Sequence, residues 1–178
     1  MQELSDELLI EKTLAGSHEA FAQLVARHKR RVFRVAARFA RNNAELDDIC
    51  QEVFIKAYEN LMSFRHSAPF EHWLARITVR ACYDALRSRR PDVSHSLAYE
   101  VKDHSIEKRE AAEEARKVLE WGMAKLRPDE RLVITLLELE ERSVREIAEL
   151  TGWSESNVKV KAHRARQALK RILEVRHE

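Results

Sequence analysis

A basic cluster follows a short glycine-containing turn near the end of the chain, in the segment REIAELTGWSESNVKVKAHRARQAL. Lysine and arginine can donate hydrogen bonds to guanine acceptors in the major groove, and an exposed valine can contact the methyl group of thymine. Cations beside such residues suit phosphate oxygens. These residue types would therefore read DNA if they shared one exposed face of a helix.

Two short helices around the turn would provide that face. The pattern SVRE is a capping box that begins at Ser143, TGW supplies the turn, and Ser154 can cap the next helix. This outline is a helix-turn-helix. At about 100° per residue, one side of the second helix collects a buried stripe. Its members are Val158, Ala162, Ala165, Leu169 and Ile172.

The opposite side and its flanks carry the residues that we expect to contact DNA, since a recognition helix uses its exposed N-terminal part for base edges. They are Ser154, Ser156, Asn157, Lys159, Val160, Lys161, His163, Arg164 and Arg166, with Gln167 on the same side. The alternative is a solvated amphipathic helix with ordinary surface charge.

A second basic face is predicted in FEHWLARITVRACYDALRSRR. The expected buried stripe is Phe70, Leu74, Ile77, Ala81 and Ala85. The opposite side collects His72, Arg76, Arg80, Tyr83, Arg87 and Arg90, with Trp73 at the edge. Cations interleaved with aromatic rings suit nucleic acid, including unstacked bases. A solvated cationic face is the alternative, and Trp73 can equally be a packing residue.

An acidic face is predicted just before it, in AELDDICQEVFIKAY. Leu46, Ile49, Cys50, Val53, Phe54 and Ala57 form the expected core side. The outward residues are Asp48, Gln51, Glu52, Ile55 and Glu59. Carboxylates repel phosphates, and an apolar residue within a polar rim is typical of protein interfaces. This helix therefore indicates a protein partner, unless it is an ordinary solvated face.

The elements that position these faces are all helical. Only 3 glycines and 3 prolines occur among 178 residues, and no strand pattern or repeat is visible. Helices are expected over 5–16, 17–40, 43–58, 69–89 and 105–125, followed by one that starts at Pro128. We expect an all-α chain with two small helical domains, 1–92 and 113–178, joined by a flexible linker, 93–112.

Composition excludes several classes of protein. The net charge is +2, but charges occur in blocks: seven cations and no acid lie between Arg27 and Arg41. The 2 cysteines form no CxxC pair and the 8 histidines lack metal-ligand spacing, so no metal, cofactor or disulfide is expected. No apolar run could cross a membrane, and no signal peptide is evident, so we expect a cytoplasmic protein without membrane insertion. No constellation of catalytic residues appears.

Taken together, LDDICQEVFIKAY, FEHWLARITVRACYDALRSRR and the C-terminal segment LRPDERLVITLLELEERSVREIAELTGWSESNVKVKAHRARQALKRIL resemble the extracytoplasmic-function branch of the sigma-70 family. The resemblance covers about residues 19–173, apart from the linker. It implies a subunit of bacterial RNA polymerase that directs promoter-specific initiation. An anti-sigma factor is a further partner expected of the family.

The resemblance also implies roles for individual residues. Polymerase, through its clamp helices, would be bound by Asp48, Gln51, Glu52 and Ile55. The minus-ten element would be bound by Asn60, Ser63, Phe64, Arg65, His72, Trp73, Arg76, Arg80, Tyr83 and Arg87. The minus-thirty-five element would be bound by the helix-turn-helix residues given above. Where this chain has Arg80 the family often has Asn, so Arg80 could alter the contact with melted DNA or add one to phosphate.

One alternative stays open at this stage. A conventional helix-turn-helix regulator would act on duplex DNA without joining polymerase. Such a protein is expected to carry a ligand-binding or dimerisation domain at its N-terminus, and an acidic helix followed by a basic aromatic helix fits that poorly.

Overall fold

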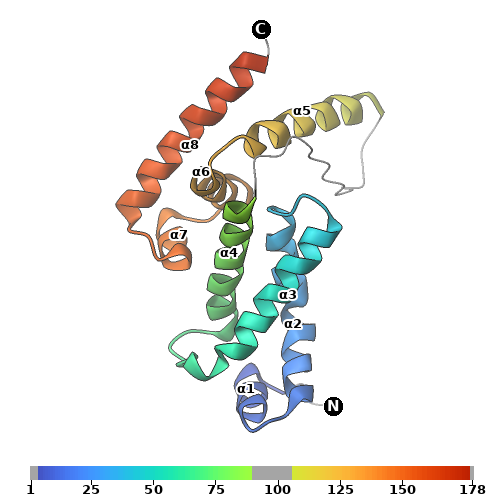
Figure 1. Ribbon diagram of the computed structural model, residues 1–178, viewed down its shortest axis with the longest axis vertical. Helices are drawn as coiled ribbons and strands as arrows, with labels where there is room; N and C mark the ends of the chain where they lie inside the picture. Colours follow the sequence, from blue (N-terminus) through green and yellow to red (C-terminus); the bar gives the residue numbers. More distant parts are fainter. Residues whose placement is uncertain (1–3, 90–105, 177–178) are drawn as a thin grey trace. The chain divides into compact units, whose positions relative to one another are not determined.

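The computed structural model describes residues 4–89 and 106–176. Two compact units make up the chain, Met1–Leu86 and Arg87–Glu178, called here the N-terminal and C-terminal units. All regular elements within the described ranges are helical, which confirms the predicted fold class (Figure 1). Most of the predicted linker lies outside the described residues, and its last part, 106–112, belongs to a helix. The domain limits themselves stay a prediction.

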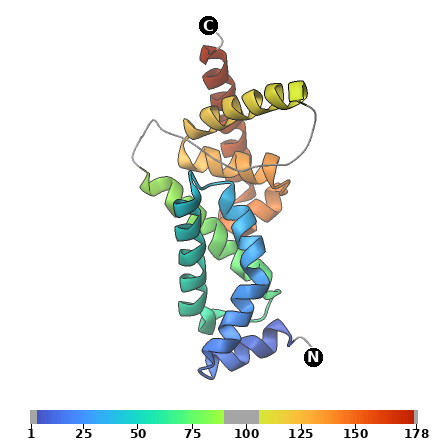
Figure 2. The same ribbon diagram turned by 90° about the vertical axis from the view of Figure 1, so that its right-hand side faces the viewer.

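Four α-helices and one short 3₁₀ turn build the N-terminal unit, and the last of these helices continues two residues past Leu86. They are α1 (Asp6–Leu14), α2 (His18–Ala37), α3 (Asn43–Glu59), η1 (Leu61–Ser63) and α4 (Phe70–Ser88). Figures 1 and 2 both show α3 beside α2, with α1 packed across the beginning of α2. The turn η1 lies within the segment between α3 and α4 that the sequence predicts as a loop.

Side-chain caps fix where the first three helices begin. The hydroxyl of Ser5 accepts a hydrogen bond from the backbone N–H of Leu8, and the hydroxyl of Ser17 accepts one from Ala20. The side-chain oxygen of Asn42 accepts from Glu45 at 2.9 Å. Each cap satisfies an N–H group that the first helical turn leaves unpaired. The predicted helix starts are confirmed.

One side of each helix forms the core of the N-terminal unit. The buried members from α2, α3 and α4 are Leu24, Val32, Ala36, Leu46, Ile49, Val53, Ala57, Phe70, Leu74, Val79, Ala81, Cys82 and Leu86. Two of the predicted α4 core residues, Ile77 and Ala85, are only half-buried. Thr78 takes a buried position instead, and its hydroxyl donates to the Leu74 carbonyl at 2.9 Å. A hydroxyl satisfied within its own helix can be buried at little cost.

The C-terminal unit contains α5 (Ile106–Ala124), α6 (Pro128–Ile134), a π-helical segment η2 (Thr135–Leu139), α7 (Val144–Thr151) and α8 (Glu155–Arg176). The described helix α8 packs against α5, α6 and α7. Pro128 occupies the first turn of α6, as predicted. The π-helical segment was not predicted. Its backbone closes with a hydrogen bond from Glu140 N–H to Thr135 C=O at 3.1 Å.

The capping box predicted at Ser143 is confirmed and sets the direction of α7. The Ser143 hydroxyl accepts from the Glu146 N–H, and the Glu146 carboxylate accepts from the Ser143 N–H at 2.9 Å and from the hydroxyl at 2.8 Å. These two bonds, and a further one from Arg142, lower the pKa of Glu146 from 4.5 to about 2. The ionised carboxylate therefore stabilises the start of the helix-turn-helix.

We expect Ser143→Ala to raise the pKa of Glu146 toward 4.5, because one of its hydrogen-bond donors is lost. Losing the cap should lower the free energy of unfolding by about 1 kcal/mol at neutral pH. In the parent, the stabilisation from Glu146 is present above pH 4.5 and is lost as the pH falls toward 2. The variant should lose it at higher pH.

A carbon-13 NMR titration of the Glu146 carboxyl measures this shift directly. Ser143→Thr keeps the hydroxyl and is the matched control. An unchanged pKa in Ser143→Ala would mean that the side-chain hydroxyl has no part in holding the carboxylate ionised.

Candidate nucleic-acid and polymerase interfaces

The turn between α7 and α8 determines which side of α8 faces outward. Gly152 ends α7 in the left-handed region, with φ of 77°, and its N–H donates to the Ala148 carbonyl. A side chain in this conformation would be strained, so glycine is the suitable residue. The hydroxyl of Ser154 then accepts from the Asn157 N–H at 3.2 Å and starts α8. The predicted helix-turn-helix is present.

Burial of one stripe leaves the predicted basic side of α8 open. Val158 and Ala165 are fully buried and Ala162 nearly so, whereas Leu169 and Ile172 pack at the edge of the core. The exposed side of the first turns carries Ser154, Ser156, Asn157, Lys159, Val160, His163 and Arg164. Val160 has 47% of its surface exposed, although it is apolar. An exposed valine among these polar side chains is able to contact the methyl group of thymine.

The two flanking cations of α8 are engaged in ion pairs within the C-terminal unit. Lys161 donates to the carboxylate of Asp129, and its ammonium lies 4.8 Å from the centre of the Trp153 ring. Arg166 donates to Glu138 at 2.7 Å. Lys161 is the more enclosed of the two, because only 20% of its side chain is exposed, against 58% for Arg166. Lys161 therefore holds α8 on α6, in addition to any role toward DNA.

The predicted basic side of α4 is also exposed. His72, Arg76, Arg80 and Arg87 lie on it, and Tyr83 is half-buried. The predicted member Arg90 lies outside the described residues. Exposed arginines on one side of a helix can neutralise backbone phosphates.

Trp73 joins an aromatic cluster at the beginning of α4. Its ring lies 5.5 Å from the rings of both Phe64 and Phe70, measured between centroids. Phe64 also contacts His66 at 4.6 Å. Trp73 and Phe64 are half-buried, so each packs on one side and shows the other side to solvent. Both interpretations of Trp73, packing and base contact, are compatible with this position.

The segment before α4 is held by local hydrogen bonds. The Asn60 amide donates to the Lys56 carbonyl at 2.8 Å, and the Ser63 hydroxyl donates to the Asn60 carbonyl at 2.7 Å. His66 has a φ of 53°, in the left-handed region. Arg65 is exposed. The Phe64 ring thus lies against the beginning of α4, and the loop also contains His66, whose backbone conformation no sequence pattern indicated.

The acidic side of α3 is exposed as predicted. Asp48, Gln51 and Glu52 face outward around Ile55, which is 44% exposed. Glu52 pairs with Lys56 at 3.1 Å, and Lys56 also reaches Asp84 on α4 at 3.5 Å. Exposed pairs of this kind are weak and can exchange for partner groups.

Two further apolar side chains near the end of α3 are exposed and lie outside the predicted set. Tyr58 is 42% exposed, and its ring also packs edge-on against Phe21 of α2, with 4.9 Å between ring centroids. Met62, in η1, is 88% exposed. Met62 was missed because the sequence assigned it to an irregular loop, where facing cannot be read from spacing.

The described part of the chain contains no cluster of histidine, cysteine and acidic side chains that could hold a metal ion. Cys50 and Cys82 form no disulfide, and burial, together with the nearby charge of Asp47, raises the pKa of Cys50 to about 11. Among the described helices, none is long and apolar enough to span a bilayer.

The C-terminal unit contains a helix-turn-helix with an exposed cationic side. The N-terminal unit has an acidic side and, separately, a basic side with aromatic residues. This layout is that of a modular helical transcription protein. Family models agree with this layout. Sigma-70 region 2 matches residues 24–91, and Sigma-70, region 4, matches residues 122–169.

Two curated relatives match nearly the whole chain. The ECF RNA polymerase sigma factor SigM of Mycobacterium tuberculosis is 31% identical over 171 residues, which span 96% of this chain and 86% of that protein. The ECF RNA polymerase sigma-E factor of Escherichia coli K12 is 32% identical over 180 residues, or 94% of each chain. The chain belongs to the extracytoplasmic-function sigma factors of the sigma-70 family.

Solved structures show the same architecture. CnrH, in complex with the cytosolic domain of CnrY, is 29% identical with a TM-score of 0.60, and the match covers 96% of this chain and 97% of CnrH. RpoE of Bartonella quintana, in complex with the anti-sigma factor NepR, gives a TM-score of 0.60 at 19% identity over 87% of this chain and 97% of RpoE. The second likeness concerns the fold alone.

The two neighbouring lysines of α8 should differ in their effect on stability. Burial raises the pKa of Asp129, but the hydrogen bond and charge of Lys161 outweigh that and hold it below its ordinary value. Lys161→Met should therefore lower the free energy of unfolding by about 1 kcal/mol, since it leaves a half-buried carboxylate unpaired. The exposed Lys159→Met should change it by less than about 0.5 kcal/mol.

Urea unfolding followed by Trp fluorescence compares the two variants. Adding Asp129→Asn to each completes a double-mutant cycle. Equal stability of the two lysine variants would contradict a structural role for the Lys161 pair.

Proposed function

We propose that this chain directs core RNA polymerase to its promoters through three separate surfaces: the exposed side of α8 for the minus-thirty-five element, α4 with the preceding loop for the minus-ten element, and α3 for polymerase. The observation that carries the proposal is the exposed side of α8. Val160 lies there among Lys159, His163 and Arg164, none of which forms an ion pair within the described part of the chain.

The side chains of α8 match the chemistry of a major groove. Arginine can donate two hydrogen bonds to guanine, and valine can contact a thymine methyl. Ser154 and Asn157 stand at the N-terminal end of the helix, where backbone N–H groups and the helix dipole attract phosphate. Site residues of all three kinds, apolar, donor and phosphate-binding, are thus present on one surface.

The minus-ten assignment is supported by the neighbourhood of cations and rings at the beginning of α4. Arg76 and Arg80 are exposed on the same helix as Trp73, and the Phe64–Trp73 cluster lies one or two turns away. Aromatic rings can stack on unpaired bases while arginines bind the backbone. Arg80, where the family often has Asn, adds a positive charge in this row, and we propose that it binds phosphate.

The polymerase assignment is supported by the combination of charge and apolar surface on α3. Asp48, Gln51 and Glu52 surround Ile55, and such a rim with an apolar centre suits a basic protein surface. Clamp helices of core polymerase are the proposed partner. A carboxylate surface would be unfavourable against DNA.

An anti-sigma factor is proposed as a further partner, and the cytoplasm as the location. CnrH is known in complex with the cytosolic domain of CnrY. The exposed apolar side chains of Ile55, Tyr58 and Met62 in this chain offer surface that such a partner could cover. The proposed activity is non-catalytic: the chain binds and positions, and polymerase performs the chemistry.

Run-off transcription with purified core polymerase tests the function. Promoters are first selected from a random DNA library with the reconstituted holoenzyme, because base preference depends on DNA shape as well as on side chains. Specific initiation that requires this chain is the expected result. Binding to duplex DNA that blocks transcription without initiating it would instead identify a conventional regulator.

Charge reversal on α3 should weaken polymerase binding. We expect Asp48→Arg combined with Glu52→Arg to reduce affinity for core polymerase at least about tenfold, because like charges facing a basic partner are costly. Glu11→Arg with Glu19→Arg is the matched control, since both residues are exposed in the same unit on other helices. Native gel titration measures the affinities. Equal affinity of both folded double variants would remove α3 from the interface.

The two leading cations of α8 should affect DNA binding differently. Arg164→Ala should cost about 1–3 kcal/mol and relax base preference at one position, if it contacts guanine. Lys159→Ala should weaken binding to all sequences and make the salt dependence shallower by about one unit of slope, if it contacts phosphate.

Holoenzyme binding to promoter variants at several salt concentrations separates these effects. Lys117→Ala, an exposed lysine on α5, is the control. Should both α8 variants bind every minus-thirty-five variant as the parent does, the basic side of α8 is only a solvated surface.

A further inference from the structure

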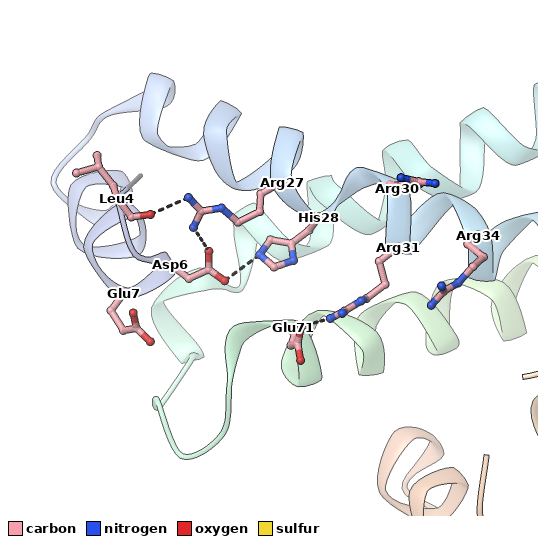
Figure 3. A pocket seen from close by; sticks show the side chains of 9 residues that line it. All are labelled: Leu4, Asp6, Glu7, Arg27, His28, Arg30, Arg31, Arg34 and Glu71. Carbon is pink, nitrogen blue, oxygen red and sulfur yellow. Dashed lines mark hydrogen bonds and ion pairs between the residues drawn. The ribbon is translucent and has the colours of Figure 1, made fainter. Parts of the chain in front are cut away.

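A buried histidine connects α1 with the beginning of α4. His28 lies on α2 with only 7% of its surface exposed, although imidazole is a polar group. Together with Asp6 of α1 it lines a groove of about 810 Å³ between α1, α2 and the first turn of α4 (Figure 3). The same groove is lined by four arginines of α2, namely Arg27, Arg30, Arg31 and Arg34. A polar side chain buried at such a place needs a hydrogen-bond partner.

The hydrogen bond to Asp6 fixes the orientation of the His28 ring. Nε2 of His28 lies 2.9 Å from one carboxylate oxygen of Asp6. An ionised carboxylate only accepts hydrogen bonds, so Nε2 is the donor. Figure 3 shows Arg27 reaching the other oxygen of Asp6, and Arg27 also donates to the Leu4 carbonyl at 2.7 Å. Both oxygens of Asp6 are thus engaged, and the imidazole is held in one orientation.

The ring of His28 contacts the first residue of α4. The centroids of the His28 and Phe70 rings are 5.3 Å apart, and their planes are inclined at 65°. Aromatic rings favour such edge-to-face contacts, which depend on the orientation of both rings. Phe70 is itself buried, with 5% of its surface exposed. The place of the Phe70 ring therefore depends on that of His28.

Phe70 in turn supports the two half-buried rings before and within α4. Its ring lies 5.7 Å from Phe64 and 5.5 Å from Trp73, measured between centroids. Phe64 and Trp73 also contact each other, and each keeps part of its surface in solvent. Contacts thus run without interruption from the carboxylate of Asp6 to the rings that the proposed function assigns to unpaired minus-ten bases.

We propose that His28, held by Asp6, is a positioning residue for the minus-ten site: it sets the place of Phe70 and thereby the arrangement of Phe64 and Trp73 that receives an unpaired base. His28 acts through these rings and does not itself contact DNA. This role rests on the proposed minus-ten function of α4 and the preceding loop. It gives a function to α1, which the three proposed surfaces leave without one.

A role of His28 that is only structural makes a different prediction. If the imidazole served only to tie α1 to α2, another donor of similar length would replace it. Glutamine carries an amide N–H at about the reach of Nε2 but has no ring. His28→Gln therefore keeps a donor for Asp6 and removes the ring contact with Phe70. Asp6→Ala breaks the same series of contacts from another helix, in case His28→Gln fails to fold.

Fluorine-19 NMR of the full-length chain labelled with 5-fluorotryptophan detects the arrangement of the rings. The chain has 3 tryptophans, and Trp73→Phe identifies the Trp73 resonance. Trp121 and Trp153 belong to the C-terminal unit and are internal references. We expect His28→Gln and Asp6→Ala each to shift the Trp73 resonance and to leave the two references unchanged. Glu7→Ala is the matched control, because it removes the neighbouring carboxylate of the same groove.

Binding of reconstituted holoenzyme to a labelled single strand measures the consequence for DNA. One strand carries the minus-ten sequence selected from the random library, and a second strand keeps the backbone but has abasic sites at those positions. The ratio of the two affinities reports base contacts alone. His28→Gln and Asp6→Ala should lower this ratio roughly fivefold, which is the low end of what one stacked base contributes. Affinity for core polymerase should stay unchanged.

Two results would overturn the positioning role alone. His28→Gln could leave both the Trp73 resonance and the affinity ratio as in the parent, which would identify the imidazole as a tie between α1 and α2 only. Glu7→Ala could change both as much as Asp6→Ala does, which would attribute the effect to the charge of α1. A parent holoenzyme that binds both strands equally would instead overturn the minus-ten function of α4, and the role of His28 with it.

Discussion

Burial of the stripe Val158–Ala162–Ala165 is the interaction on which the C-terminal surface depends. Because these residues pack against α6 and α7, rotation of α8 about its axis is fixed. Burying apolar surface stabilises a fold by about 25 cal/mol per Å² removed from water. Summed over the stripe, this stabilisation exceeds what a single surface charge contributes. Lys159, Val160 and Arg164 are consequently held outward. The Lys161–Asp129 pair reinforces the same rotation from the flank.

Burial of one side of each helix also separates the charges of the N-terminal unit. Helices α2, α3 and α4 each bury one side, so the carboxylates of α3 and the arginines of α4 lie on the exposed sides of their own helices. An ion pair between Lys56 of α3 and Asp84 of α4 joins the two helices. A chain with a net charge of +2 can therefore present an acidic and a basic surface at once. Each surface can then meet a partner of opposite charge.

Much of the fold was predictable, because helix caps and apolar periodicity are local. The cap at Ser17, the capping box at Ser143 and the glycine turn at Gly152 all act within four residues. Features that depend on distant residues were not predictable. Lys161 meets Asp129 from 32 residues away, and Arg31 meets Glu71 from 40 residues away, so neither pair leaves a periodic signal. For the same reason the sequence showed the block of cations near Arg27, while the groove that it lines appeared only in the structure.

The central claim is that α8 and α4 meet different promoter elements in the same holoenzyme. Site-specific photo-cross-linking measures this most directly, with a photoreactive amino acid placed at Val160 in one variant and at His72 in another, both exposed. The account predicts that the Val160 probe marks duplex DNA at the minus-thirty-five element, and that the His72 probe marks the melted minus-ten element. Cross-links from both probes to one element, or from Val160 to polymerase alone, would contradict it.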